Sequence, residues 1–119
     1  MALHTDLPIY KVAYDLLGLV VHAVRNMPRD MKPALGKRMV DECVKVMTLV
    51  FRANVARDKS AYLVELIERV EVLNLLLRFC VDKKQLSNLS IKQYSAAIAL
   101  TTSIGKQATG WRKASSPAT

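Results

Sequence analysis

The sequence has few of the side chains from which catalytic and metal sites are built. Its 119 residues include two histidines, His4 and His22, and two cysteines, Cys43 and Cys80. No Cys-x-x-Cys, His-Glu-x-x-His, P-loop or Gly-x-Gly-x-x-Gly motif occurs. Neither histidine has the Glu-x-x-His spacing of a di-iron bundle, since Leu19 stands three residues before His22. We therefore expect a protein that is not an enzyme and that needs no metal and no cofactor.

Long apolar runs are also missing. The longest, residues 16–21, is far shorter than the roughly 20 residues that span a bilayer, so no membrane segment is expected. The first residues have neither the basic nor the apolar region of a signal peptide. The two cysteines are far apart and suit small core positions in a reducing compartment. These features predict a cytoplasmic protein without a membrane partner.

Apolar residues recur at helical spacing through nearly the whole chain, and no alternating run predicts a strand. Breaks fall around Pro28, around residues 57–59 and at residues 82–89, where Ser90 can cap a following helix. The length suits one domain covering residues 1–119. The fold class is therefore all-α, an up-down four-helix bundle. The predicted helices are residues 8–27, 33–56, 60–81 and 90–111, followed by a flexible tail at 112–119.

The second and third helices are apolar on more than one face. Beside the main core positions, each carries an adjoining stripe. One explanation is that the additional apolar residues fill the core of a single subunit. Exposure of the stripes in a monomer would leave a sticky patch, which favours a homo-oligomer instead. The adjoining stripes are Val40, Val44, Met47 and Phe51 in the second helix, and Val72, Leu75, Leu76 and Phe79 in the third.

Positive charge is the main functional signal, because 18 Lys and Arg face 10 Asp and Glu, a formal charge of +8. Four cations recur every seven residues: Arg38, Lys45, Arg52 and Lys59. This spacing keeps them close to one line along a helix. Such a charge either keeps an apolar bundle soluble or binds a polyanion through its phosphates. The scattered aromatic residues do not form a base-stacking platform, so no base-specific recognition is expected. The candidate phosphate contacts are Arg38, Lys45, Arg52, Arg57 and Lys59.

Several segments, taken in order, resemble the accessory variability determinant (Avd) proteins of diversity-generating retroelements. The resemblance covers about residues 7–111 and depends on the order and spacing of the segments together. A sibling family with the same architecture comprises the four-helix-bundle proteins encoded in ribosomal RNA intervening sequences. The segments are Leu7-Pro8-Ile9-Tyr10-Lys11, Pro28-Arg29-Asp30, Leu35-Gly36-Lys37-Arg38, Phe51-Arg52-Ala53-Asn54, Ala56-Arg57-Asp58-Lys59, Val70-Glu71-Val72-Leu73, Leu75-Leu76-Leu77-Arg78, Leu86-Ser87, Tyr94, Ile104-Gly105-Lys106 and Gly110-Trp111.

The resemblance implies a homopentameric barrel with a basic surface that binds a reverse transcriptase and nucleic acid, RNA or DNA. It implies support of mutagenic cDNA synthesis and retrohoming. Arg78 matches an arginine that the family uses toward the reverse transcriptase, whereas Asn74 stands where some members carry another arginine. The alternative interpretations are a ribosome- or ribosomal-RNA-associated bundle and a scaffold without nucleic acid.

Overall fold

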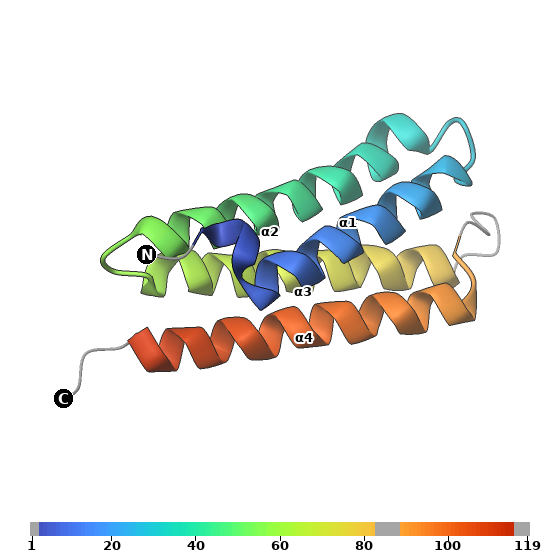
Figure 1. Cartoon of the computed structure of the whole chain (residues 1–119). Coiled ribbons are helices and arrows are strands. Elements are labelled where there is room, and N and C mark those ends of the chain that lie inside the picture. The colour runs from blue at the N-terminus through green and yellow to red at the C-terminus, as the bar shows by residue number, and fades with distance from the viewer. Residues whose placement is uncertain (1–2, 83–88, 116–119) are drawn as a thin grey trace.

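The computed structural model describes residues 3–82 and 89–115, and these residues form helices without a strand. A short 3₁₀ turn, η1 (His4–Asp6), precedes α1 (Pro8–Arg25). A π-helical turn, η2 (Lys32–Gly36), leads into α2 (Lys37–Val55), which is followed by α3 (Ser60–Asp82) and α4 (Ile91–Ser115). Each α-helix packs on its neighbours in sequence, and α1 also packs on α4, so that the described helices close an up-down bundle (Figure 1). The expected all-α four-helix bundle is confirmed.

The core lies along the axis of the bundle, which is 51 Å long. Leucine, valine and methionine side chains spaced by three and four residues meet there, as helical periodicity requires. Both cysteines belong to this core and are free thiols. The largest fully buried apolar side chains include Leu16, Met39, Leu63, Leu66, Leu73, Leu77 and Ile104.

Local signals account for the starts of α1 and α4. Pro8 occupies the first turn of α1, where its missing N–H has no helical partner. Ser90 and Gln93 form a reciprocal capping box before α4: each backbone N–H donates to the other side chain, at 3.0 Å. Pro33 is accommodated in the π-helical turn that opens the second helical segment.

The fourth helix is longer than the sequence predicts. α4 continues to Ser115 instead of ending at Trp111, so residues 112–115 are helical and are not part of a flexible tail. Residues 116–119 of that predicted tail lie outside the described residues. The extra turn carries Arg112 and Lys113. It lies at the end of the bundle that also holds the α2–α3 connection (Figure 1).

Gly36 allows α1 and the start of α2 to approach closely. A Cβ at this position would lie 2.8 Å from Cγ1 of Val24, closer than real Cβ atoms come. Gly36 is buried, so the hydrogen side chain is a packing requirement at this crossing.

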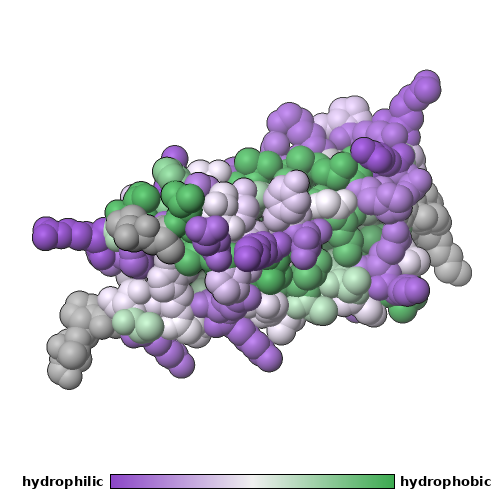
Figure 2. Space-filling model, in the orientation of Figure 1, coloured by the Kyte–Doolittle hydropathy of each residue, from purple (hydrophilic) through white to green (hydrophobic). Residues whose placement is uncertain are grey.

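The surface combines apolar and basic regions. Figure 2 shows hydrophobic areas on one face, separated by a row of hydrophilic side chains that crosses its middle, and further hydrophilic chains that project from the ends and the lower edge. Within the described residues, no helix has the length and hydropathy needed to cross a membrane.

Candidate nucleic-acid and protein interface

The predicted line of cations is shorter on α2 than the heptad spacing suggests. Arg38, Lys45 and Arg52 are exposed on this helix. The helix ends at Val55 because Ala56 adopts an extended conformation with ψ of 148°. Lys59 therefore lies beyond the helix, and the prediction of four cations along one helix is corrected to three. Arg57 is exposed in the connection between α2 and α3.

Lys59 caps the C-terminal end of α2 instead of facing solvent. Its Nζ donates to the backbone oxygens of Ala53 at 2.8 Å, Ala56 at 2.9 Å and Asn54 at 3.3 Å. The last carbonyls of a helix have no helical partner and carry the negative end of the helix dipole, so an ammonium group stabilises them. The same Nζ lies 5.9 Å from the ring centre of Trp111 on α4. The contacts of Lys59 therefore stabilise the end of α2 and its packing on α4.

Arg38 is partly engaged by the carboxylate of Glu42, whose burial the charge pattern of the sequence does not predict. Its Nε donates to Oε1 of Glu42 at 2.9 Å, and the Glu42 side chain is fully buried. Nη1 of Arg69 on α3 donates to the same oxygen at 3.3 Å. Glu42 follows Met39 by three residues and precedes Val46 by four, and this spacing could have shown that it belongs to the core face.

Lys45, Arg52 and Arg57 remain as exposed cations. None of them takes part in an ion pair between described residues. Unpaired arginine and lysine side chains on a surface can bind phosphate oxygens without reading the base sequence. Of the predicted phosphate contacts, these three best fit that role.

Arg78 lies near the end of α3, and its side chain is 63% exposed. Its Nε donates to Oδ2 of Asp82 at 2.9 Å, the local pair that the spacing of four residues allows. This bond raises the pKa of Arg78 above its usual value, and hydrogen bonding to Tyr94 adds to the rise. The guanidinium is therefore charged and oriented while it stays accessible.

A shallow, open depression of about 650 Å³ adjoins Arg78 on the outer face of α3 and is lined by side chains of this helix alone. Leu75 and Phe79 line it, and Leu75 is 71% exposed. An arginine beside exposed apolar side chains has the composition that is enriched in protein–protein interfaces. This part of α3 therefore suits contact with another protein.

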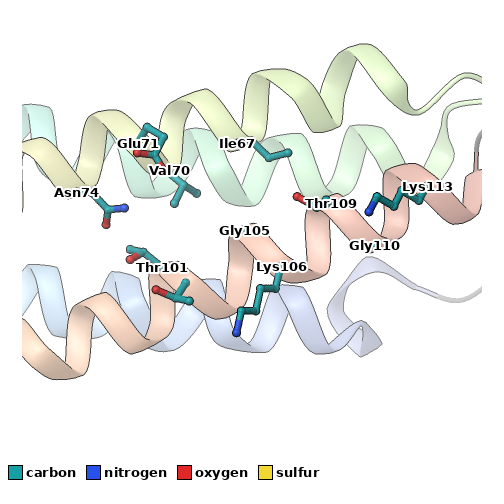
Figure 3. A pocket seen from close by; sticks show the side chains of 11 residues that line it. Ile67, Val70, Glu71, Asn74, Thr101, Gly105, Lys106, Thr109, Gly110 and Lys113 are labelled. Atoms are coloured by element: carbon teal, nitrogen blue, oxygen red, sulfur yellow. The ribbon is translucent and has the colours of Figure 1, made fainter.

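A second depression, of about 540 Å³, follows the boundary between α3 and α4 (Figure 3). Glu71 and Asn74 come from α3, whereas Lys106 and Lys113 come from α4. Oδ1 of Asn74 is buried without a hydrogen-bond partner in the part of the chain that the structure describes. The groove combines charges of both signs with threonines and glycines. In residues 3–82 and 89–115, no group of three His, Cys, Asp or Glu side chains is arranged to hold a metal ion.

The additional apolar stripes of the second and third helices are partly exposed. Val44 and Phe51 on α2 are exposed, as are Leu75 and Phe79 on α3, and Val55 extends the α2 face. The remaining members of both stripes are half-buried. His4 covers part of Phe51 through an edge-to-face contact at 4.9 Å between ring centres. Exposed apolar side chains that follow one face of a helix can contact another protein.

The fold and the surface chemistry thus define a basic four-helix-bundle protein with exposed cations and exposed apolar side chains. The chain belongs to the bAvd-like family, whose sequence profile matches residues 8–115. The match starts at the beginning of α1 and ends at the last residue of α4, so it includes the helical turn beyond Trp111. The resemblance to Avd proteins is confirmed. No curated protein matches the chain.

Proposed function

We propose that this chain is a non-catalytic accessory protein of a diversity-generating retroelement. It binds the retroelement's reverse transcriptase and nucleic acid in the cytoplasm, and it supports mutagenic cDNA synthesis and retrohoming. The match of residues 8–115 to the bAvd-like family carries this proposal. The structure supports it with a basic, partly apolar surface, as an adaptor between a protein and a nucleic acid requires.

Arg78 is the proposed centre of the reverse-transcriptase contact. Asp82 orients its guanidinium, and the adjoining depression between Leu75 and Phe79 can receive an apolar side chain of the partner. Removal of Arg78 deletes a charged anchor from an exposed position, so the core of the bundle stays intact.

Phosphate contacts are proposed for Lys45, Arg52 and Arg57, which are exposed and take part in no ion pair between described residues. Arg38 retains a share of this role through the exposed part of its side chain. Backbone-directed binding makes affinity strongly dependent on salt and nearly independent of sequence.

A ring of five copies is the proposed assembly. The exposed apolar residues of α2 and α3 suggest contacts that a monomer leaves uncovered. Subunits that each carry a charge of +8 repel one another, so these contacts must be sufficiently apolar to outweigh the repulsion.

The proposal is tested by co-purification with the retroelement reverse transcriptase from the same genome. We expect the wild-type chain and Lys92→Ala to retain the polymerase, and Arg78→Ala to lose it. Lys92 is a matched control because it is exposed at the same end of the bundle and loses the same charge. The absence of wild-type co-purification would contradict the proposed function.

A further inference from the structure

The last turn of α4 is attached to the connection between α2 and α3. Nε of Arg112 lies 3.3 Å from Oγ of Ser60, the first residue of α3. One residue earlier, the Trp111 ring lies beneath the ammonium group of Lys59. Residues 52 positions apart in the sequence therefore meet at one end of the bundle (Figure 1).

Lys59 is the centre of this attachment. Its ammonium group binds three backbone oxygens at the end of α2 and, through the cation–π contact, the side chain of Trp111. Because these donors are already engaged, Lys59 is poorly placed to bind a phosphate itself. It can instead determine where the neighbouring cations of α4 lie relative to Arg57.

This end of the bundle is strongly basic. Residues 52–60 and 106–115 contain six Lys and Arg and a single acid, Asp58. Oδ1 of Asp58 accepts a hydrogen bond from the backbone N–H of Ser60, which engages part of that carboxylate. The middle of α3, in contrast, carries three exposed glutamates at positions 65, 68 and 71. A polyanion is therefore attracted to the end and repelled by the middle of α3.

We propose that Arg52, Arg57, Arg112 and Lys113 form one composite phosphate-binding surface, here called the junction surface, with Lys59 as its positioning residue. The inference rests on the proposed nucleic-acid binding and specifies where it occurs. Its ligand is the phosphate backbone of a nucleic acid, which the cations at this end attract without reading the bases. The half-buried Trp111 is occupied by Lys59, so the junction surface offers charge without a free stacking platform.

The first experiment measures the binding of a fluorescein-labelled poly(U) oligonucleotide by anisotropy over a series of salt concentrations. The double variant Arg112→Gln/Lys113→Gln is compared with Lys32→Gln/Lys92→Gln, which removes the same charge at the opposite end. We expect the first pair to weaken binding about tenfold at low salt and the control pair less than about threefold. The slope of log K against log salt should become shallower by about 0.7 for each single-strand phosphate that a variant no longer neutralises.

The second experiment separates positioning from direct contact. Lys59→Met should make the slope of log K against log salt shallower by as much as Arg112→Gln/Lys113→Gln does. The triple variant should show no further loss of affinity or of slope. If the losses add, Lys59 contacts phosphate itself, which would overturn its positioning role. Trp111→Leu provides an independent variant, because it removes the cation–π contact with Lys59 without changing any charge. It should still weaken RNA binding.

The outcomes distinguish this inference from the proposed function. If the wild-type chain fails to bind poly(U) at low salt, the proposed nucleic-acid binding is wrong. If it binds but Arg112→Gln/Lys113→Gln behaves like the control pair, only the junction surface is wrong. If phosphatidylserine vesicles displaced the labelled poly(U) as effectively as unlabelled poly(U) does, a nucleic acid would be overturned as the ligand of this surface.

Discussion

Arg69 on α3 donates a hydrogen bond to the fully buried carboxylate of Glu42 on α2, with 3.3 Å between Nη1 and Oε1. Arg38 binds the same oxygen from one turn earlier on α2. Oε2 of Glu42 and Nε of Arg69 are buried without a hydrogen-bond partner among the described residues. The pair thus connects two helices at the edge of a mainly apolar core, where desolvation of the carboxylate offsets much of the attraction.

Glu42→Ala should be strongly destabilising. It leaves the largely buried Arg69 guanidinium without its carboxylate, and loss of one member of a buried pair costs about 3–5 kcal/mol. Urea unfolding measures the change. The double variant Glu42→Leu/Arg69→Leu should recover most of the loss, since it leaves no unpaired charge in the core and Arg38, which loses the same carboxylate, is about half exposed to solvent. A single variant within about 1 kcal/mol of the wild type would show that the pair carries little of the α2–α3 contact.

Gly36→Ala should destabilise the crossing between α1 and α2. The new Cβ would lie 2.8 Å from Cγ1 of Val24, and overpacking of this kind costs about 1–3 kcal/mol. Gly18→Ala is the matched control, because a Cβ at this helical position meets nothing within 4 Å and should stabilise by about 0.5–1 kcal/mol. Thermal unfolding should therefore shift in opposite directions for the two variants. A shift in the same direction would contradict the close approach.

Stability should decline at alkaline pH partly through Cys43. Burial raises the pKa of this thiol from 9.0 to about 12, and the nearby Glu42 carboxylate adds to the rise. Between these values the unfolded thiol loses its proton while the folded thiol keeps it. The free energy of unfolding therefore falls as pH rises, by at most about 1.4 kcal/mol per pH unit from this group. Cys43→Ala should show a shallower decline between about pH 9 and pH 11, and an identical slope would exclude the thiol as a cause.

The helices and their buried faces can be predicted because their signals are local. Apolar spacing, Pro8 and the cap formed by Ser90 and Gln93 act within a few residues. The end of α4 cannot be predicted in this way. Trp111 and Arg112 are held by Lys59 and Ser60, which are remote in the sequence, so composition alone suggests a flexible tail.

The sequence predicts which charged residues belong to the candidate site better than it predicts where their side chains lie. The heptad spacing correctly indicates that Lys45 and Arg52 lie on α2. The same spacing includes Lys59, but the backbone is extended after Val55, so Lys59 lies beyond the helix and its ammonium group caps the last carbonyls. The spacing of Glu42 is compatible with the core face, but its partner Arg69 belongs to another helix. Tertiary partners therefore decide which of the charged residues remain available.

The exposed apolar residues of α2 and α3 lead to a prediction about assembly. Light scattering should give a mass near five times 13.3 kDa for the wild-type chain. Val44→Lys should reduce this mass, because it places a charge within the exposed apolar face of α2. Tyr14→Lys, which changes an exposed aromatic on α1, should leave the mass unchanged. A wild-type monomer at micromolar concentration would refute the ring.

The accessory role is tested most directly by cDNA synthesis from the retroelement's template RNA with purified reverse transcriptase. We predict full-length mutagenic cDNA when the wild-type chain or Lys92→Ala is added. We predict little or none when the chain is omitted or replaced by Arg78→Ala, which should retain the thermal stability and oligomeric mass of the wild type. Equal cDNA yield with and without the wild-type chain would contradict the proposed function.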